Sequence, residues 1–360
     1  MNKAFWKDKK ILITGHTGFK GSWLAIWLKE LGADIIGFSL ESNNKLNNFN
    51  LSGIGKEMVD INCDIRNPEK LNEVFNNNKI DIVFHLAAQS LVLEGYNNPT
   101  DTYTTNVNGT LNLLEAIKKQ KNKIVGIFIT TDKVYENKES MWGYKEIDSL
   151  GGFDPYSSSK ACCEILINSY RESFFNFNKY SEHQKSIATV RAGNVIGGGD
   201  WAKNRIIPDI FRSIEGDKEL EIRNPNSVRP WQHVLEPLAG YLLLAEKMWT
   251  TPSEYCEAWN FGPEIKALYD VKNIVIKINN LCGDKLKVNY INNKKIHETN
   301  ILLLDITKSR LRLNWNPLLT LDEALDFTTE WYKQYKNKNV LNICVKQISN
   351  YMSRMDVFNE

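Results

Sequence analysis

The stretch that most constrains the fold is a glycine-rich segment close to the N-terminus. Residues 10–14 (K-I-L-I-T) form a short apolar run rich in β-branched residues, which passes directly into G-H-T-G-F-K-G-S-W-L. Gly15, Gly18 and Gly21 stand three residues apart. Their missing β-carbons allow a tight turn, the approach of a pyrophosphate and close packing of the next helix on its strand. This order of strand, glycine turn and helix predicts a dinucleotide-binding unit.

Strand and helix patterns continue to alternate along the first half of the chain. Apolar runs at 34–40, 79–85 and 123–130 read as strands, and residues 102–119 read as a helix between the last two. Such alternation requires a parallel sheet with right-handed crossovers. We therefore predict an α/β fold. A Rossmann-type doubly wound parallel sheet should occupy residues 1–195, and residues 196–360 should mainly form a smaller C-terminal substrate-binding lobe, with some segments returning to the sheet.

An acidic residue and a pair of alanines suggest which dinucleotide is bound. Glu41 lies twenty residues after Gly21, at the end of the second apolar run. An acidic side chain there can accept a hydrogen bond from an adenosine ribose hydroxyl and would repel a 2′-phosphate, which favours NAD over NADP. Ala87 and Ala88 follow the strand that ends at His85. Their small side chains leave room for a ligand at the carboxyl edge of the sheet.

Composition excludes several classes of function. Of the 360 residues 42% are hydrophobic, enough for a large core, and the net charge of +2 gives no nucleic-acid or polybasic membrane footprint. No apolar run reaches the ~18 residues of a membrane span, and residues 1–10 lack the apolar region of a secretory signal. The six cysteines show no C-x-x-C spacing, so we expect reduced packing residues and no metal site. We predict a cytoplasmic protein with small-molecule partners.

A second group of motifs carries candidate catalytic residues. The strand at 123–130 runs into T-D-K (131–133), and Y-S-S-S-K follows at 156–160. Tyr156 and Lys160 are spaced i,i+4, so on a helix both side chains rise from one face. For tyrosine to act as a base near neutrality, its pKa must fall by roughly three from the usual value of ~10. A nearby lysine ammonium and a bound nicotinamide cation both act in that direction.

These motifs together resemble a known family. G-x-x-G-x-x-G, H-L-A-A (85–88), T-D-K and Y-x-x-x-K resemble the extended short-chain dehydrogenase/reductase superfamily. The longer runs look like the CDP-glucose 4,6-dehydratase group, and the resemblance covers nearly the whole chain. Among them are T-G-H-T-G-F-K-G-S-W-L, W-G-Y-K-E, G-G-F-D-P-Y-S-S-S-K, R-A-G-N-V-I-G-G-G-D-W and W-N-F-G-P.

The resemblance implies a dehydration of a nucleotide-diphospho-sugar on tightly held NAD. Tyr156 would take the proton of the C4 hydroxyl, with Thr131 hydrogen-bonded to that hydroxyl and Lys160 holding the cofactor ribose. Asp132 would protonate the hydroxyl that leaves from C6. Most sugar-nucleotide 4,6-dehydratases carry glutamate where this chain has Lys133. Two roles stay open for Lys133: the base at C5, or electrostatic support for the enolate.

The resemblance also implies the remaining site residues and the assembly. The expected cofactor-binding residues are Gly15, Thr17, Gly18, Phe19, Gly21, Glu41, Asp64, Ile65, Leu86, Ala87, Ala88, Tyr156 and Lys160. The expected substrate-binding residues are Gln89, Asn194, Arg205, Ile207, Arg223 and Arg229. A homodimer or homotetramer is expected, joined through the helices at 102–119 and 157–174, and the product would feed deoxysugar synthesis for lipopolysaccharide O-antigen.

Two departures from the family pattern bear on the substrate. Leu93 stands where the CDP-glucose group usually has arginine, and Leu303 stands where it usually has lysine. The sequence therefore leaves open a dehydratase for another nucleotide sugar, a nucleotide-sugar 4-epimerase, and a binding paralogue without turnover. Asp132 and Lys133 favour the dehydratase, because an epimerase has no leaving group at C6 to protonate.

Overall fold

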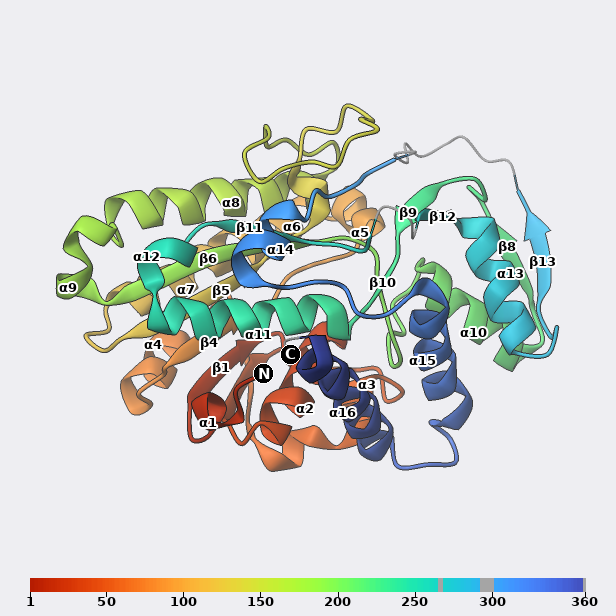
Figure 1. The fold of residues 1–360 in the computed structure, drawn as a ribbon, viewed down its shortest axis with the longest axis horizontal. Coiled ribbons are helices and arrows are strands. Elements are labelled where there is room, and N and C mark those ends of the chain that lie inside the picture. The colour runs from red at the N-terminus through yellow and green to blue at the C-terminus, as the bar shows by residue number, and fades with distance from the viewer. Residues whose placement is uncertain (265–267, 292–300, 359–360) are drawn as a thin grey trace.

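The computed structural model describes residues 1–264, 268–291 and 301–358, and a parallel sheet forms its centre (Figure 1). Seven strands follow the order β11-β6-β5-β4-β1-β2-β3. Every neighbouring pair in it is parallel. The strand order reverses between β1 and β4, and doubly wound sheets bind ligands at such a switch point. The predicted α/β fold with a Rossmann-type sheet is confirmed.

The strands of the sheet come from both halves of the chain. They are β1 (Lys10–Thr14), β2 (Asp34–Ser39), β3 (Val59–Asn62), β4 (Ile82–His85), β5 (Ile124–Ile129), β6 (Lys185–Ala192) and β11 (Ala258–Phe261). Because β11 pairs with β6, the second half of the chain extends the sheet at one edge. The division at residue 195 stays an interpretation.

Helices cover both faces of the sheet. One face carries α4 (Pro68–Asn77), α7 (Gly109–Lys118) and α8 (Pro155–Ser173), whose apolar side chains pack with those of the strands. The other face carries α2 (Phe19–Glu30) and α11 (Leu235–Thr250), and α16 (Val340–Phe358) packs against α2. Trp23 and Trp27 of α2 are fully buried, as expected for its helical face.

The helix predicted at 102–119 is interrupted. It consists of α6 (Pro99–Tyr103), a π-helical turn η2 (Thr104–Asn108) and α7. In the turn, the Asn106 side chain accepts from the Gln89 amide at 2.8 Å and donates to the Gln89 carbonyl at 3.0 Å and to Ser159 Oγ at 2.8 Å. A π turn is a common way to direct a side chain inward at a functional site. The apolar spacing did not reveal this interruption because it continues through the turn.

Part of the second half of the chain forms a smaller lobe beside the sheet, drawn to the right in Figure 1. Its elements include α10 (Ile206–Gly216), β8 (Glu219–Ile222), β9 (Val228–Pro230), β12 (Leu268–Asp270), α13 (Val271–Leu281), β13 (Lys287–Tyr290) and α15 (Leu321–Gln334). β8 pairs with β13, and β9 pairs with β12. The shorter elements are α1 (Lys3–Trp6), α3 (Asn48–Ser52), η1 (Ile54–Glu57), α5 (Val92–Asn97), η3 (Asp132–Val134), η4 (Phe177–Lys179), α9 (Tyr180–His183), β7 (Val195–Ile196), β10 (Gln232–His233), α12 (Pro252–Tyr255) and α14 (Thr307–Leu313).

The asparagine-rich segment at 42–50 is partly buried. Asn48 begins α3 and is fully buried. Its amide donates to Ser22 Oγ at 3.1 Å, and its carbonyl oxygen accepts from Trp331 Nε1 at 3.2 Å and from Cys344 Sγ at 3.2 Å. A buried amide is tolerated when its hydrogen bonds are satisfied. Asn48 therefore joins α2 to the two C-terminal helices.

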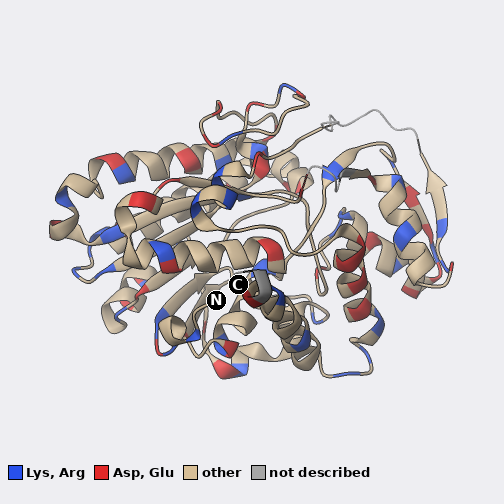
Figure 2. Cartoon of the chain, in the orientation of Figure 1, with Lys and Arg blue, Asp and Glu red and all other residues tan. Residues whose placement is uncertain are grey.

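Charged residues of both signs are mixed along the outer helices, for example along α8 and α11 (Figure 2). Within the described parts of the chain, no helix is both long and apolar enough to span a membrane. The same residues contain no cluster of three or more His, Cys, Asp or Glu side chains arranged to hold a metal ion.

Candidate active site

A cavity of about 1390 Å³ opens at the carboxyl edge of the sheet. Its wall is formed by the glycine turn after β1, the ends of β4, β5 and β6, the start of α8 and the loop before α10. Typical small-molecule pockets measure ~300–1,000 Å³. The larger volume here suits two ligands side by side, a dinucleotide and a sugar nucleotide.

The glycine turn forms a cradle against the start of α2. Gly15 has φ of +77°, and a Cβ there would lie 2.6 Å from the Ala87 nitrogen. A Cβ at Gly21 would lie 2.2 Å from the Gly15 carbonyl oxygen. Gly18 caps the helix without a side-chain hydrogen bond, and residues 18–21 at the start of α2 line the cavity. A helix N-terminus of this kind binds phosphate, and the residues present fit the pyrophosphate of a dinucleotide.

The expected adenosine end lies at the tips of β2 and β3. Glu41, Asp64 and Ile65 all line the cavity. The Asp64 carboxylate bonds Arg66 through Nε and Nη2, and this contact lowers its pKa. Glu41 remains placed for a ribose, with its own amide donating to Asn62 Oδ1 at 3.0 Å.

Tyr156 and Lys160 rise from the first two turns of α8, and both line the cavity. The helix starts at Pro155, and the Asp154 carboxylate accepts from the Ser157 amide at 3.0 Å. Lys160 is buried and donates to the Ile129 carbonyl oxygen at 3.0 Å. The predicted pairing on one helical face is therefore present in the structure.

The pKa of Tyr156 moves opposite to the expected direction. Burial raises it to about 12, and the hydrogen bond between Tyr156 and Thr131 and the charge of Arg205 only partly oppose this rise. The prediction that Lys160 would lower the phenol pKa is not met in the protein alone, because burial outweighs the favourable charges. A base at this position needs additional positive charge close to the phenol.

Asp132 lies at the bottom of the same cavity, directly after β5. Its Oδ1 accepts from the Thr131 hydroxyl at 3.0 Å. Its other oxygen rests against Gly193, where a Cβ would come within 2.0 Å of Oδ2. Burial raises the Asp132 pKa, while the charge of Lys133 and the Thr131 hydroxyl oppose the rise. A raised carboxyl pKa favours the protonated form that a general acid requires.

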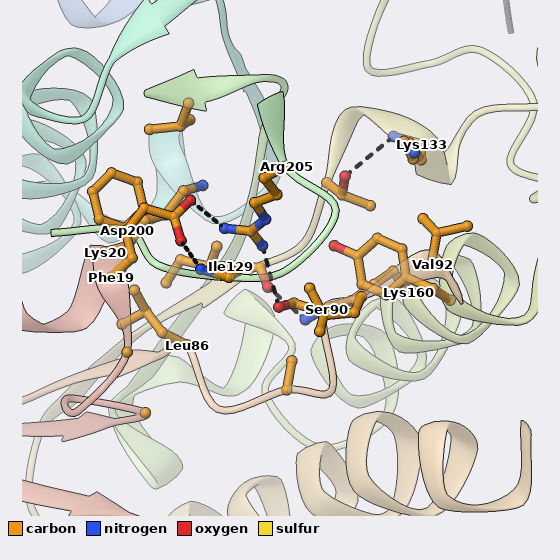
Figure 3. A pocket seen from close by; sticks show the side chains of 18 of the residues that line it. Phe19, Lys20, Leu86, Ser90, Val92, Ile129, Lys133, Lys160, Asp200 and Arg205 are labelled. Atoms are coloured by element: carbon orange, nitrogen blue, oxygen red, sulfur yellow. Dashed lines mark hydrogen bonds and ion pairs between the residues drawn. The ribbon is translucent and has the colours of Figure 1, made fainter. Parts of the chain in front are cut away.

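Arg205 reaches across the cavity from the loop before α10 (Figure 3). It donates to the Asp200 carboxylate at 2.9 Å and approaches Ser90 Oγ at 3.4 Å. The sequence predicted Arg205 but not its two partners. The expected substrate residues Asn194, Ile207, Arg223 and Arg229 also line the cavity, as do all expected cofactor and catalytic residues.

Gln89 is an exception among the expected substrate residues, because it does not line the cavity. Its side-chain amide donates to Thr102 Oγ1 at 2.8 Å and to the Leu91 carbonyl oxygen at 3.1 Å, and its oxygen accepts from the Leu91 amide at 2.6 Å. The side chain is therefore committed to the turn that leads into α5. This geometry gives no support to a substrate contact by Gln89.

The two departures from the family pattern differ in importance. Leu93 lines the cavity. Leu303 is buried outside the cavity wall, and its carbonyl oxygen accepts from the Tyr144 amide at 2.8 Å. Of the two leucines, only Leu93 lines the cavity, so only Leu93 is placed to affect the choice of sugar nucleotide.

Lys20 is a cavity residue that the sequence analysis did not single out. It lies in the first turn of α2 and lines the cavity. Burial and the positive charges of Arg205 and Lys160 lower its pKa to about 8, although Asp132 opposes this. In the sequence, the one feature that marks Lys20 is its position between the second and third glycines of the motif.

The sheet, the glycine cradle and the tyrosine and lysine on α8 define the class of the extended short-chain dehydrogenases/reductases. Within that class, residues 12–328 match the GDP-mannose 4,6 dehydratase family, and the chain belongs to this family.

Comparisons with individual proteins agree with this placement. The chain is 45% identical over 354 residues to the CDP-glucose 4,6-dehydratase of Salmonella typhimurium, covering 98% of this chain and 99% of that protein. The dTDP-glucose 4,6-dehydratase of Bacillus anthracis in complex with NAD superposes with a TM-score of 0.76 at 23% identity, covering 91% and 97% of the two chains. The UDP-glucose 4-epimerase of Thermotoga maritima superposes with a TM-score of 0.79 at 22% identity, covering 91% and 100%. The fold alone therefore does not separate dehydratases from epimerases.

The contact between Gly193 and Asp132 generates a prediction. In Gly193→Ala the new methyl group must displace the Asp132 carboxyl, so we expect a folded protein whose kcat falls by about tenfold or more, up to the ~10²–10⁴-fold that complete loss of a general acid costs. The matched control is Gly262→Ala after β11, where the nearest atom to the added Cβ is 3.5 Å away. Melting temperature and kcat should be measured for both. Normal turnover in Gly193→Ala would contradict the placement of Asp132.

Proposed function

We propose that the protein is a NAD-dependent 4,6-dehydratase of a nucleotide-diphospho-hexose, which converts CDP-D-glucose to CDP-4-dehydro-6-deoxy-D-glucose and water. The observation that carries this proposal is the position of Asp132 and Lys133 in the cavity that also holds Tyr156 and Lys160. A 4-epimerase needs only the second pair, because it neither protonates a leaving group at C6 nor removes a proton at C5. The identity of 45% to a CDP-glucose 4,6-dehydratase supports the same substrate.

The residues of the glycine cradle would hold the cofactor pyrophosphate, and Glu41 would accept from the adenosine ribose. Glu41 favours NAD because its carboxylate would repel a 2′-phosphate. When bound, NAD supplies the hydride acceptor for C4 of the sugar and the hydride donor for C6. Lys160, which lines the cavity, would donate a hydrogen bond to the cofactor ribose.

Tyr156 would begin the chemistry by taking the proton of the C4 hydroxyl. Thr131, which already bonds the phenol, is placed to orient that hydroxyl. Burial alone makes the phenolate unfavourable, so the tyrosine depends on Lys160 and on the positive charge of the oxidised cofactor. This dependence would restrict proton removal to the loaded enzyme.

Elimination would fall to Asp132 and Lys133. The ketone at C4 acidifies the proton at C5, and loss of that proton forms the enolate that expels the C6 hydroxyl. Asp132, whose pKa is raised by burial, would give its proton to this hydroxyl so that it leaves as water. Lys133 would either take the C5 proton or stabilise the enolate charge, and both roles place its amine beside C5.

Recognition of the substrate would rest on the arginines that line the cavity. Arg229 and Arg205 have planar forks that suit diphosphate oxygens, and Arg205 is preoriented by Asp200. Leu93 replaces a positive side chain of the CDP-glucose group, so another nucleotide sugar is the alternative substrate. The reaction belongs to deoxysugar synthesis. Use of its product for O-antigen and a cytoplasmic location stay proposals.

The substrate is tested by turnover of a panel. Purified protein should be incubated with NAD and CDP-, dTDP-, GDP- or UDP-glucose, and a product lighter by one water should form from CDP-glucose. Mass spectrometry and the alkaline absorbance of the 4-keto sugar would detect it. The control is Tyr156→Phe, which should fold, bind NAD and lose most of its turnover, on the order of 10²–10⁴-fold. A product isomeric with its substrate would replace the dehydratase proposal by the epimerase.

The division of labour is tested in a second variant. Asp132→Asn combined with Lys133→Met should leave substrate binding and C4 oxidation intact but stall elimination. The rate of product formation should therefore fall by ~10²–10⁴-fold. One equivalent of substrate should then give the near-ultraviolet absorbance of reduced nicotinamide with little 6-deoxy product. Absence of both signals would show that the pair is needed before elimination. Normal product formation would remove the main argument against the epimerase.

Assembly is also open to test. Of the four apolar residues expected at the dimer interface on α7 and α8, Leu114 and Ile167 are buried against the sheet, whereas Leu111 and Ile165 are exposed at 36% and 60%. Only the exposed pair is available to a second copy. We expect a dimer in sedimentation that Ile165→Glu weakens and Ile276→Glu on α13, 43% exposed, leaves intact. A monomeric wild type at micromolar concentration would remove this proposal.

A further inference from the structure

Helix α8 carries a further polar residue on the face of Tyr156 and Lys160. Glu164 follows Lys160 by one helical turn, and only 3% of it is exposed. Its carboxylate accepts four hydrogen bonds: from Thr130 Oγ1 at 2.6 Å, from Thr189 Oγ1 at 2.7 Å, and from Arg191 Nε and Nη2, both at 2.9 Å. A carboxylate so fully bonded in the interior fixes the position of every group that contacts it.

The network continues beyond Arg191. Its Nη1 donates to the Tyr135 hydroxyl at 2.7 Å and to the Glu146 carbonyl oxygen at 3.2 Å. The Tyr135 hydroxyl in turn donates to Asn260 Oδ1 at 2.8 Å on β11. Strands β5, β6 and β11 and helix α8 are thus tied together by one buried polar network.

The bonded residues flank the proposed catalytic ones in sequence. Thr130 immediately precedes the T-D-K segment, and Tyr135 closely follows it. Arg191 lies two residues before Gly193, against which Asp132 rests. The two segments that carry the candidate catalytic groups and the strand that leads to Gly193 therefore meet at the Glu164–Arg191 ion pair, although neither residue of the pair lines the cavity.

We propose that Glu164 and Arg191 form a positioning pair, which sets α8 and the T-D-K segment at the separation that the reaction requires. This inference rests on the proposed function, since it assigns a role within the same reaction. Removal of one partner would leave the other as an unpaired buried charge, whereas loss of single bonds to the pair would alter its geometry more gently.

The Glu164 carboxylate of this pair also places a negative charge near Lys160. The groups that face Lys160 are Glu164 and Cys163 on α8, His85 on β4 and Lys20 on α2. Burial lowers the Lys160 pKa, and Cys163 and Glu164 oppose that change. His85 adds no positive charge near neutrality, because burial lowers its pKa to about 3. Loss of the Glu164 charge would therefore let Lys160 lose its proton at a lower pH.

Two threonines offer a matched pair of variants. Thr130 and Thr189 each donate one hydrogen bond of similar length to the same carboxylate, but only Thr130 adjoins the T-D-K segment. Thr130→Val and Thr189→Val should lower the melting temperature by similar amounts. Only Thr130→Val should lower kcat, by about tenfold with KM little changed, because a misplacement of about 1 Å can cost on the order of 10²-fold and loss of one hydrogen bond should shift the segment by less. Unchanged kcat in Thr130→Val, or an equal loss in Thr189→Val, would overturn the inference.

The charge is tested by Glu164→Gln, which keeps the shape of the side chain. The alkaline limb of the pH profile of kcat, and the loss of NAD affinity at high pH measured by tryptophan fluorescence, should both move to lower pH. The control is Glu236→Gln on α11. Glu236 is also buried, with 1% exposed, and its carboxylate accepts hydrogen bonds from Tyr351 and two backbone amides. This variant should lose stability without any shift of these curves. An unshifted Glu164→Gln, or an equal shift in Glu236→Gln, would refute the role of the charge.

The outcomes separate this inference from the proposed function. Turnover of the nucleotide-sugar panel by the wild type decides the function, and the ratio of variant to wild type decides the positioning role. The dependence of NAD affinity on pH needs no turnover, so it remains a test for a wild type that is inactive on every sugar of the panel. If Glu164→Gln does not fold, the threonine variants still decide the positioning role.

Discussion

Burial of ionisable side chains at the carboxyl edge of the sheet is the constraint on which the site depends. Removal from water disfavours the charged form of every group there. Burial is the largest influence on Tyr156, Asp132, Lys160 and Lys20, and in each it favours the neutral species. For Asp132 this outcome is useful, because a neutral carboxyl can give a proton. For Tyr156 it is adverse, and only added positive charge can reverse it.

The sheet creates this environment through its topology. Because β1, β4, β5 and β6 are parallel, their carboxyl ends meet at one edge, where the strand order reverses. The glycine turn then packs so closely on the end of β4 that no side chain fits at Gly15. The lobe from the second half closes the other side with Arg205 and its neighbours. These contacts bury several polar groups of the cavity wall, and a hydrogen bond between buried groups is stronger than one in water.

Much of this could be predicted from sequence because the features are local. The glycine spacing, the i,i+4 tyrosine and lysine, and the strand and helix periods depend on near neighbours in the chain, and the structure places those residues around the cavity. Features that depend on partners distant in the sequence could not be predicted. The commitment of Gln89 to Thr102, the burial of Asn48 beneath Trp331 and the bond of Arg205 to Asp200 require the folded arrangement. The rise of the Tyr156 pKa could not be predicted for the same reason, because the groups around the phenol come from several separate segments.

The difference between a dehydratase and an epimerase is small in structural terms, since an epimerase superposes on this chain as well as a dehydratase does. The scaffold that holds NAD and a sugar nucleotide is common to both. What elimination adds is an acid and a base or enolate support within reach of C5 and C6. Under the proposed function, this addition occupies the short η3 turn after β5, where Gly193 leaves space for the Asp132 carboxyl and the Thr131 hydroxyl donates to it. On that proposal, the dehydratase differs from the epimerase at this turn by two side chains, with a glycine opposite one of them.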